Sequence, residues 1–271
     1  ILIVDIEKEF GIKRSKEYFG VKDCNIEILP KPKVNIDKII SNELREKYGN
    51  ENQLNWFGID YPFLLGNEIE FLSFIDNSLQ YLKSKISNDK FSYNFIPGYV
   101  RKLTHYAIME NILNIYNNGI VIVINGNGTK SYRKVEDDII EEIVPNNDEP
   151  SKQIENYVNG YDGPVFLTGF HCIGMSVTLI NEKLGNFDNV IVSHEQYVNN
   201  PDILYQLCRF VFNYISWNKK DKNIKITNIY CADKKCIDIC KNYESQIDII
   251  VNEMNGICVD KETLMGKYFL E

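Results

Sequence analysis

Arginine and alanine are scarce in this chain: its 271 residues include five arginines and two alanines, against 38 isoleucines and 32 asparagines. Arg and Ala are encoded mostly by GC-rich codons, and Ile, Asn and Lys by AT-rich ones, so the bias indicates an AT-rich genome. Because 25 of the 30 basic residues are lysine, a position that keeps arginine is a candidate for a role that needs a guanidinium group. These positions are Arg14, Arg45, Arg101, Arg133 and Arg209.

Long apolar runs and a secretory signal are also missing. No apolar stretch approaches the roughly 20 residues of a membrane-spanning helix, so we expect no membrane association. The seven cysteines are an odd number and are scattered through the chain, which without a signal peptide indicates a reducing compartment, the cytoplasm. The first residue is Ile1 rather than methionine, and we therefore expect a piece of a longer protein.

The composition is that of a folded protein with an acidic surface. Hydrophobic residues make up 44% of the chain and aromatic residues 12%, which is enough for a core and excludes a disordered chain. The length suits one large or two small domains. A net charge of -8 argues against general coating of a polyanion, but it leaves room for a local basic groove.

Hydrophobic periodicity predicts an α/β fold in which helices flank a parallel sheet. The chain alternates between strand and helix patterns from Phe91 onward, which is typical of parallel sheets. Strands are expected at residues 1–4, 91–96, 120–124, 165–168, 190–193 and 224–231. Helices are expected at residues 37–48, 68–86, 100–116, 201–215 and 234–254. Irregular structure is expected at residues 26–33, which hold two prolines, and at residues 219–223. Residues 135–153 are expected to form a helix fragment and an exposed loop.

This pattern divides the chain in two. Residues 1–90 form a mostly helical N-terminal segment, either an insert or a bridge from a preceding domain, to which we assign no chemistry. Residues 91–271 form the α/β domain.

A glycine-rich segment, NGNGTKS, follows the predicted strand 120–124. A phosphate-binding P-loop requires the pattern G-x-x-x-x-G-K-[ST], in which the backbone amides surround the phosphates. Here Thr129 separates Gly128 from Lys130, and the following residues SYRK do not begin an apolar helix. We therefore expect a turn at the carboxyl end of a strand, the edge at which α/β proteins bind ligands.

Further motifs follow in a characteristic order. A strand ends in Thr168-Gly169, and the sequence GMSVT begins at Gly174. The strand NVIV comes next, then Asn200-Pro201, and then Gln206-Leu207-Cys208-Arg209. Together these features resemble the second RecA-like domain of superfamily 2 helicases and translocases, with motif V, the following strand and motif VI. The Asn-Pro step is similar to that of the Swi2/Snf2 branch, and the resemblance covers residues 91–231.

The resemblance implies a role for each matching residue. Arg209 would be the arginine finger that neutralises charge on the γ-phosphate, and Gln206 would lie one turn before it on the same helix face. Gly174 and Ser176 would contact nucleotide. Residues expected to contact a nucleic-acid strand are Thr168, Gly169, His171, Asn125 and Gly126. The implied partners are DNA or RNA and the first RecA-like domain of the same chain, with ATP and Mg²⁺ bound in the full-length protein.

The sequence departs from this family in motif VI. The usual pattern is Q-x-x-G-R-x-x-R, but Phe210 and Asn213 stand at the two arginine positions. A single-arginine finger is one interpretation, and a non-catalytic RecA-like interaction domain with a decayed motif VI is the alternative. The first RecA-like domain, with its Walker A motif, would lie upstream of Ile1, in a protein of a large DNA virus, located in the host cytoplasm or the virion. A third interpretation is a nucleotide or sugar transferase that uses the glycine-rich segment at residues 125–131.

A metal site is not expected. Cys231, Cys236, Cys240 and Cys258 lack the paired C-x2-C spacing of structural zinc sites. We expect free thiols packed as small apolar groups.

Overall fold

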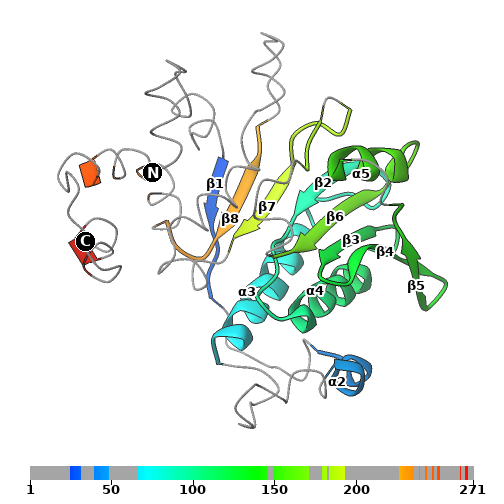
Figure 1. Ribbon diagram of the computed structural model, residues 1–271, viewed down its shortest axis with the longest axis horizontal. Helices are drawn as coiled ribbons and strands as arrows, with labels where there is room; N and C mark the ends of the chain where they lie inside the picture. Colours follow the sequence, from blue (N-terminus) through cyan, green and yellow to red (C-terminus); the bar gives the residue numbers. More distant parts are fainter. Residues whose placement is uncertain are drawn as a thin grey trace.

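A single eight-stranded mixed sheet organises the part of the chain that can be described. The computed structural model describes residues 25–31, 40–48, 66–145, 149–170, 179–181, 183–192 and 226–234, and isolated positions between 238 and 267. The strand order is β1-β8-β7-β2-β6-β3-β4-β5 (Figure 1). The strands are β1 (Asn25–Ile28), β2 (Ser92–Phe95), β3 (Ile120–Asn125), β4 (Gly128–Val135), β5 (Asp138–Ile143), β6 (Pro164–Gly169), β7 (Asn189–Val192) and β8 (Asn228–Cys231).

Six neighbouring strands, from β1 to β3 in the sheet order, run parallel, and β4 and β5 extend the sheet as an antiparallel hairpin. The helices are α2 (Asn42–Tyr48), α3 (Gly66–Leu82), α4 (Lys102–Ile115) and α5 (Pro150–Val158). The predicted α/β fold is thereby confirmed at the level of a mainly parallel sheet with flanking helices. The RecA-like identity and the domain boundary at residue 90 stay predictions.

The two faces of the sheet bury separate apolar clusters. In β3, Ile120, Ile122 and Ile124 pack on the face that carries α5, whereas Val121 and Val123 pack on the face that carries α3 and α4. All six residues of β3 and all six of β6 are buried. A strand covered on both faces has no need of polar alternation, and this explains the continuous apolar runs in the sequence.

The prediction of irregular structure at residues 26–33 was wrong for its first three residues, whereas residues 29–31 are irregular as expected and residues 32–33 lie outside the described residues. Residues Asn25–Ile28 form β1, which pairs in parallel with β8. The pairing continues one step further, because the backbone N–H of Leu29 donates to the carbonyl of Cys231 over 2.9 Å. Pro30 follows directly and supplies no N–H, so the proline ends the strand and does not prevent it.

The prediction for residues 135–153 was also wrong in its first part. These residues hold the end of β4, the whole of β5 and the beginning of α5. A two-residue turn joins β4 to β5, with Glu136 in the left-handed region at φ 57°. Hairpin turns of this kind usually carry Asn or Gly, so Glu136 hid the hairpin in an acidic sequence. The helix predicted after it is α5, which begins at Pro150.

Strand β4 (Gly128–Val135) was not predicted, because the expected turn takes up only Gly126 and Asn127. The other described elements agree with the predictions to within about five residues. Helix α2 begins late, at Asn42, where the Ser41 hydroxyl accepts a hydrogen bond from the backbone N–H of Leu44 over 3.1 Å and caps it. The predicted strand 1–4, helix 201–215 and loop 219–223 lie outside the described residues, and the predicted helix 234–254 is described only at isolated positions.

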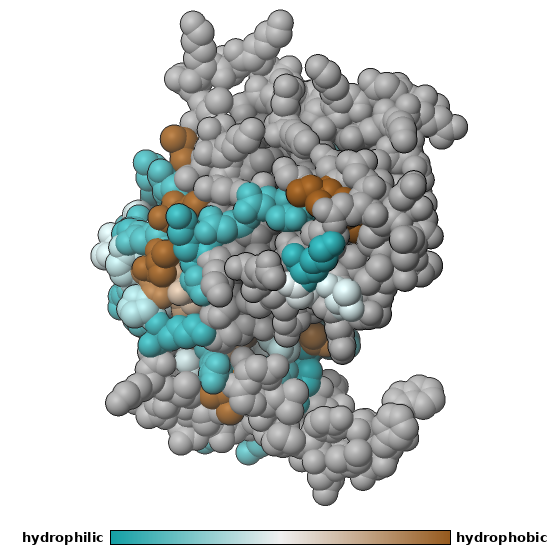
Figure 2. Space-filling model, turned by 90° about the vertical axis from the view of Figure 1, so that its left-hand side faces the viewer, coloured by the Kyte–Doolittle hydropathy of each residue, from teal (hydrophilic) through white to brown (hydrophobic). Residues whose placement is uncertain are grey.

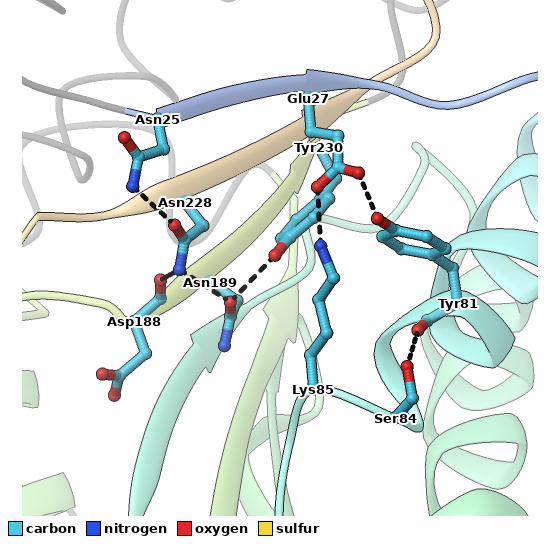
Figure 3. A network of polar contacts seen from close by, with 9 residues as sticks. All are labelled: Asn25, Glu27, Tyr81, Ser84, Lys85, Asp188, Asn189, Asn228 and Tyr230. Atoms are coloured by element: carbon cyan, nitrogen blue, oxygen red, sulfur yellow. Dashed lines mark hydrogen bonds and ion pairs between the residues drawn. The ribbon is translucent and has the colours of Figure 1, made fainter.

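Four asparagines form a ladder across the parallel strands, and Figure 3 shows three of them, Asn25, Asn228 and Asn189. Asn25, Asn228, Asn189 and Asn94 stand in register on β1, β8, β7 and β2. Each side-chain amide donates to the next: Asn25 to Asn228 over 3.0 Å, Asn228 to Asn189 over 3.3 Å and Asn189 to Asn94 over 2.8 Å. Asn94 donates to the backbone carbonyl of Val165 in β6 over 3.1 Å. The ladder thus links five adjacent strands in one register.

We expect Asn189→Leu to lower the free energy of unfolding by about 1–3 kcal/mol, because it removes the hydrogen bond that the buried side-chain oxygen of Asn94 accepts from Asn189. The measurement is urea unfolding followed by circular dichroism. Asn25→Leu is the matched control: Asn25 is exposed, so water replaces its lost contact. Equal losses in the two variants would contradict the importance of the buried rung.

Candidate functional site

The carboxyl edge of the parallel strands brings together the four predicted site residues that the structure describes. Val123 is in register with Thr168, and Ile124 with Gly169, so Asn125 and Gly126 lie next to the end of β6. On the other side of β6, the backbone N–H of Gly98 donates to the carbonyl of Gly169 over 2.8 Å. Thr168, Gly169, Asn125 and Gly126 are therefore neighbours at this edge, and their contact with nucleic acid stays a prediction.

The tight turn between β3 and β4 contacts the first turn of α4. Lys102 donates from Nζ to Oδ1 of Asn127 over 2.6 Å, and Asn127 donates from Nδ2 to the hydroxyl of Tyr106 over 3.2 Å. Inside the turn, the backbone N–H of Asn127 donates to Oδ1 of Asn125 over 2.8 Å. A lysine and the amino end of a helix therefore lie beside Gly126, both of which favour a nearby anion.

Two polar atoms at this edge are buried without a hydrogen-bond partner: the hydroxyl of Thr168 and Nδ2 of Asn125. The side chain of Thr168 is inaccessible, and that of Asn125 is 7% exposed. By strand alternation, both point to the face of the sheet that carries α4. Most buried polar atoms in folded proteins are satisfied, so these two donors mark a place where a ligand oxygen would gain hydrogen bonds.

The segment that connects β2 to α4 is closely packed against the first turn of α4. A Cβ atom added at Gly98 would lie 2.1 Å from Cδ2 of His105, so only glycine fits there. A ring nitrogen of His105, Nε2, lies 2.7 Å from the carbonyl oxygen of Tyr99. The hydroxyl of Thr104 accepts from the backbone N–H of Tyr99 over 2.9 Å. The Pro97-Gly98 step marks the strand end in the sequence, but the need for glycine comes from a contact seven residues away.

Arg101, one of the five arginines, precedes α4 and binds a carboxylate. Its Nε donates to Oε1 of Glu68 in α3 over 2.7 Å, and its Nη2 donates to Oε2 of the same carboxylate. The side chains of Arg101 and Glu68 are 17% and 1% exposed. This bidentate ion pair connects α3 to the amino end of α4. The guanidinium group of Arg101 therefore has a structural role.

The remaining predicted site residues lie outside the described residues. These are His171, Gly174, Ser176, Gln206 and Arg209. Their roles stay predictions.

A second polar cluster joins β1 to α3 and was not foreseen from the sequence (Figure 3). Nζ of Lys85 lies 2.7 Å from Oε2 of Glu27, and the Tyr81 hydroxyl donates to the same carboxylate. The Lys85 ammonium also lies 4.3 Å from the ring centroid of Tyr81 and 5.4 Å from that of Tyr230. These hydrogen bonds hold the pKa of the Glu27 carboxyl below its usual range and raise the pKa of Lys85. The two charged groups, Glu27 and Lys85, bind each other, so the cluster connects β1 to α3 and the turn that follows it.

The face of the molecule on the β1 side is mainly hydrophilic where it is described, and its apolar residues form small separate spots (Figure 2). Scattered exposed apolar residues are normal for a folded protein. None of the helices in the described part of the chain combines the length and apolar character needed to cross a bilayer.

Metal ligands do not gather within the described ranges: no three His, Cys, Asp or Glu side chains there could hold one ion. Cys231 is buried at the end of β8. The other three cysteines considered for zinc lie outside the described residues.

We expect Arg101→Ala to lower the free energy of unfolding by about 3 kcal/mol, because it removes the counter-charge of a buried carboxylate. Arg133→Ala is the matched control. The guanidinium of Arg133 also binds a carboxylate, that of Glu142 over 2.7 Å, but the two side chains are 50% and 38% exposed, so the loss should stay below about 1 kcal/mol. Denaturant unfolding of both variants distinguishes them, and similar losses would show that the Glu68 pair is not special.

No family model matches this chain, and no curated protein shows significant sequence similarity to it.

Proposed function

We propose that this chain is the C-terminal half of an ATP-dependent superfamily 2 helicase or translocase, a second RecA-like domain that contacts a nucleic-acid strand. The proposal rests on two buried donors at the carboxyl edge of β3 and β6. There Thr168 and Asn125 each keep a buried donor without a partner, next to Gly126, Lys102 and the amino end of α4.

These groups are of the kind that binds a nucleic-acid backbone. Hydroxyls, side-chain amides, backbone N–H groups and lysines make most contacts to phosphate oxygens in protein–nucleic acid complexes. Such contacts recognise the sugar–phosphate chain and not its base sequence. They are also local, so they are compatible with the net charge of -8, because the acidic groups can lie elsewhere on the surface.

The topology supports a crevice at the same edge. The central strand β2 has β6 on one side and β7 on the other. Ligands of open α/β sheets bind where the chain changes direction along the sheet, outside the carboxyl ends of the strands. The segment resembling motif V follows β6 directly, and the segment resembling motif VI follows β7. Both therefore start from strands that adjoin β2 at the carboxyl edge.

In this proposal ATP and Mg²⁺ are bound by the first RecA-like domain of the full-length protein, which supplies the phosphate cradle. Arg209 contributes a permanently charged fork for the γ-phosphate, and Gln206 lies one turn before it. Gly174 permits a close backbone approach, and Ser176 offers a hydroxyl. Hydrolysis then requires both domains, so closure of the domains is coupled to the chemistry.

The transferase interpretation has lost its main support. It needs residues 125–131 to form a loop around phosphates, but only Gly126 and Asn127 lie in the turn, and Gly128–Val135 form strand β4. The non-catalytic interaction domain shares the fold of the proposed translocase and differs in whether Arg209 acts on ATP.

In the full-length protein, we expect Arg209→Ala to abolish nucleic-acid-stimulated ATP hydrolysis and to leave the folded structure intact. The loss should be about 10³-fold or more, in the range of arginine fingers in related reactions. Arg133→Ala, on the exposed hairpin, is the control and should hydrolyse normally. Two results would contradict the proposal that ATP hydrolysis needs both Arg209 and the first RecA-like domain. They are ATPase activity retained by Arg209→Ala and ATP hydrolysis by the 271-residue chain alone.

We expect Thr168→Val, which replaces the unpartnered hydroxyl with a methyl group of similar size, to weaken binding of single-stranded nucleic acid by about threefold to tenfold. Fluorescence anisotropy with labelled oligonucleotides at fixed salt is the measurement. Thr227→Val is the control, because the Thr227 hydroxyl bonds the carbonyl of Phe187 within the fold. A variant at Thr168 that binds as the wild type does would remove this residue from the interface.

A further inference from the structure

Strand β5 forms the outer edge of the sheet at the end opposite to β1 (Figure 1). Its six residues pair with β4 in one uninterrupted register, from Val135 opposite Asp138 to Lys130 opposite Ile143. In the described part of the chain, β4 is its only neighbour in the sheet.

The free side of β5 carries backbone groups for another strand. In an antiparallel pair, residues that bond across the ladder alternate with residues that do not. Val144 donates from its backbone N–H to the carbonyl of Thr129 over 3.2 Å, so the even-numbered residues of β5 face β4. The N–H and C=O groups of Ile139 and Ile143 therefore point away from the sheet.

Strand β5 is guarded only by acidic side chains. Proteins protect edge strands with proline, a bulge or charged side chains, above all lysine, and the sequence DIIEEI has neither proline, lysine nor a bulge. Its apolar side chains are instead exposed: 39% for Ile139, 37% for Ile140 and 77% for Ile143. An edge that is regular, apolar and open is typical of a strand that receives a partner.

The charges on β5 select the kind of partner. Every ionisable side chain of β5 is acidic, namely Asp138, Glu141 and Glu142, and the turn adds Glu136 and Asp137. The basic residues of the hairpin, Lys130, Arg133 and Lys134, lie on β4 and bind Glu141, Glu142 and Asp137. Three cations therefore face five carboxylates, and the hairpin keeps a net charge of -2. A second copy of the chain would place an acidic strand beside an acidic strand, and like charges disfavour such a pair.

We propose that the edge of β5 binds an extended segment of a protein partner in which apolar and basic residues alternate, and that this segment adds a ninth strand to the sheet. Backbone hydrogen bonds to Ile139 and Ile143 provide affinity, and the side chains along β5 provide specificity. The isoleucines contact apolar side chains of the partner, and the excess negative charge of the hairpin, which includes Asp138, attracts its lysine or arginine side chains. This surface lies apart from the β3–β6 edge and does not depend on the helicase proposal.

The test uses three labelled octapeptides and the full chain. They are an alternating Lys/Val peptide, the same peptide with alternate backbone amides N-methylated, and an alternating Glu/Val peptide. Fluorescence anisotropy should show binding of the first only. Ile143→Lys should weaken it by at least about tenfold, because the lysine repels the basic peptide and guards the edge. Ile226→Lys is the matched control, since Ile226 is also an exposed isoleucine, at 50%, but lies outside the hairpin, and it should bind as the wild type does.

Three results would overturn the proposal. One is no binding of the Lys/Val peptide, and another is equal binding of its N-methylated form, which cannot add a strand. The third is concentration-dependent dimerisation that Ile143→Lys abolishes, because the occupant would then be a second copy of the chain. Circular dichroism of Ile143→Lys establishes that the sheet is intact, and the exposure of Ile143 makes this the expected result.

Discussion

A buried primary amide has two donors and an acceptor oxygen, and each group left unsatisfied inside a protein costs free energy. The ladder from Asn25 to Asn94 meets this requirement by placing amides side by side on four parallel strands. A shift of one residue in any of these strands would turn its asparagine to the opposite face. The ladder thus fixes the register of β1, β8, β7 and β2, and the bond from Asn94 to Val165 extends this register to β6.

The candidate site inherits its geometry from that register. Thr168 lies three residues after Val165, so its position at the carboxyl edge is determined by the amide contact at the other end of the strand. The pair of Arg101 and Glu68 then fixes where α4 begins, and with it the position of Lys102 beside the β3–β4 turn. Two polar contacts outside the candidate site therefore determine where its groups stand.

The sequence predicted those features that depend on residues close together in the chain. The apolar runs of β3 and β6 and the periodicity of α3 and α4 are local, and the parallel arrangement follows from their alternation. The turn at Glu136 was missed because glutamate rarely adopts the left-handed backbone conformation that this turn requires. Arginine scarcity marked all five arginines alike, and it does not distinguish Arg101, which binds a buried carboxylate, from the exposed Arg133. The partner of Arg101, Glu68, is 33 positions away, and no periodic pattern connects them.

Long-range polar contacts were beyond prediction for the same reason. The bond between Asn25 and Asn228 joins residues 203 positions apart, and the ion pair of Glu27 and Lys85 joins residues 58 apart. Each of these residues is by itself an ordinary polar side chain in an Asn-rich, Lys-rich sequence. Only the folded chain distinguishes those that carry structure from those that face solvent.

The pairing of β1 with β8 also has a consequence for the order of folding. Contacts between neighbours in sequence form quickly, whereas closing a long loop is slow. The β3–β4–β5 hairpins are local and can form while the rest of the chain is still extended. Strand β1 leaves the ribosome before any other described element, yet it has no partner until β8, some 200 residues later, has been made. Among the described strands, β1 is thus the first to be synthesised and pairs with a strand made much later.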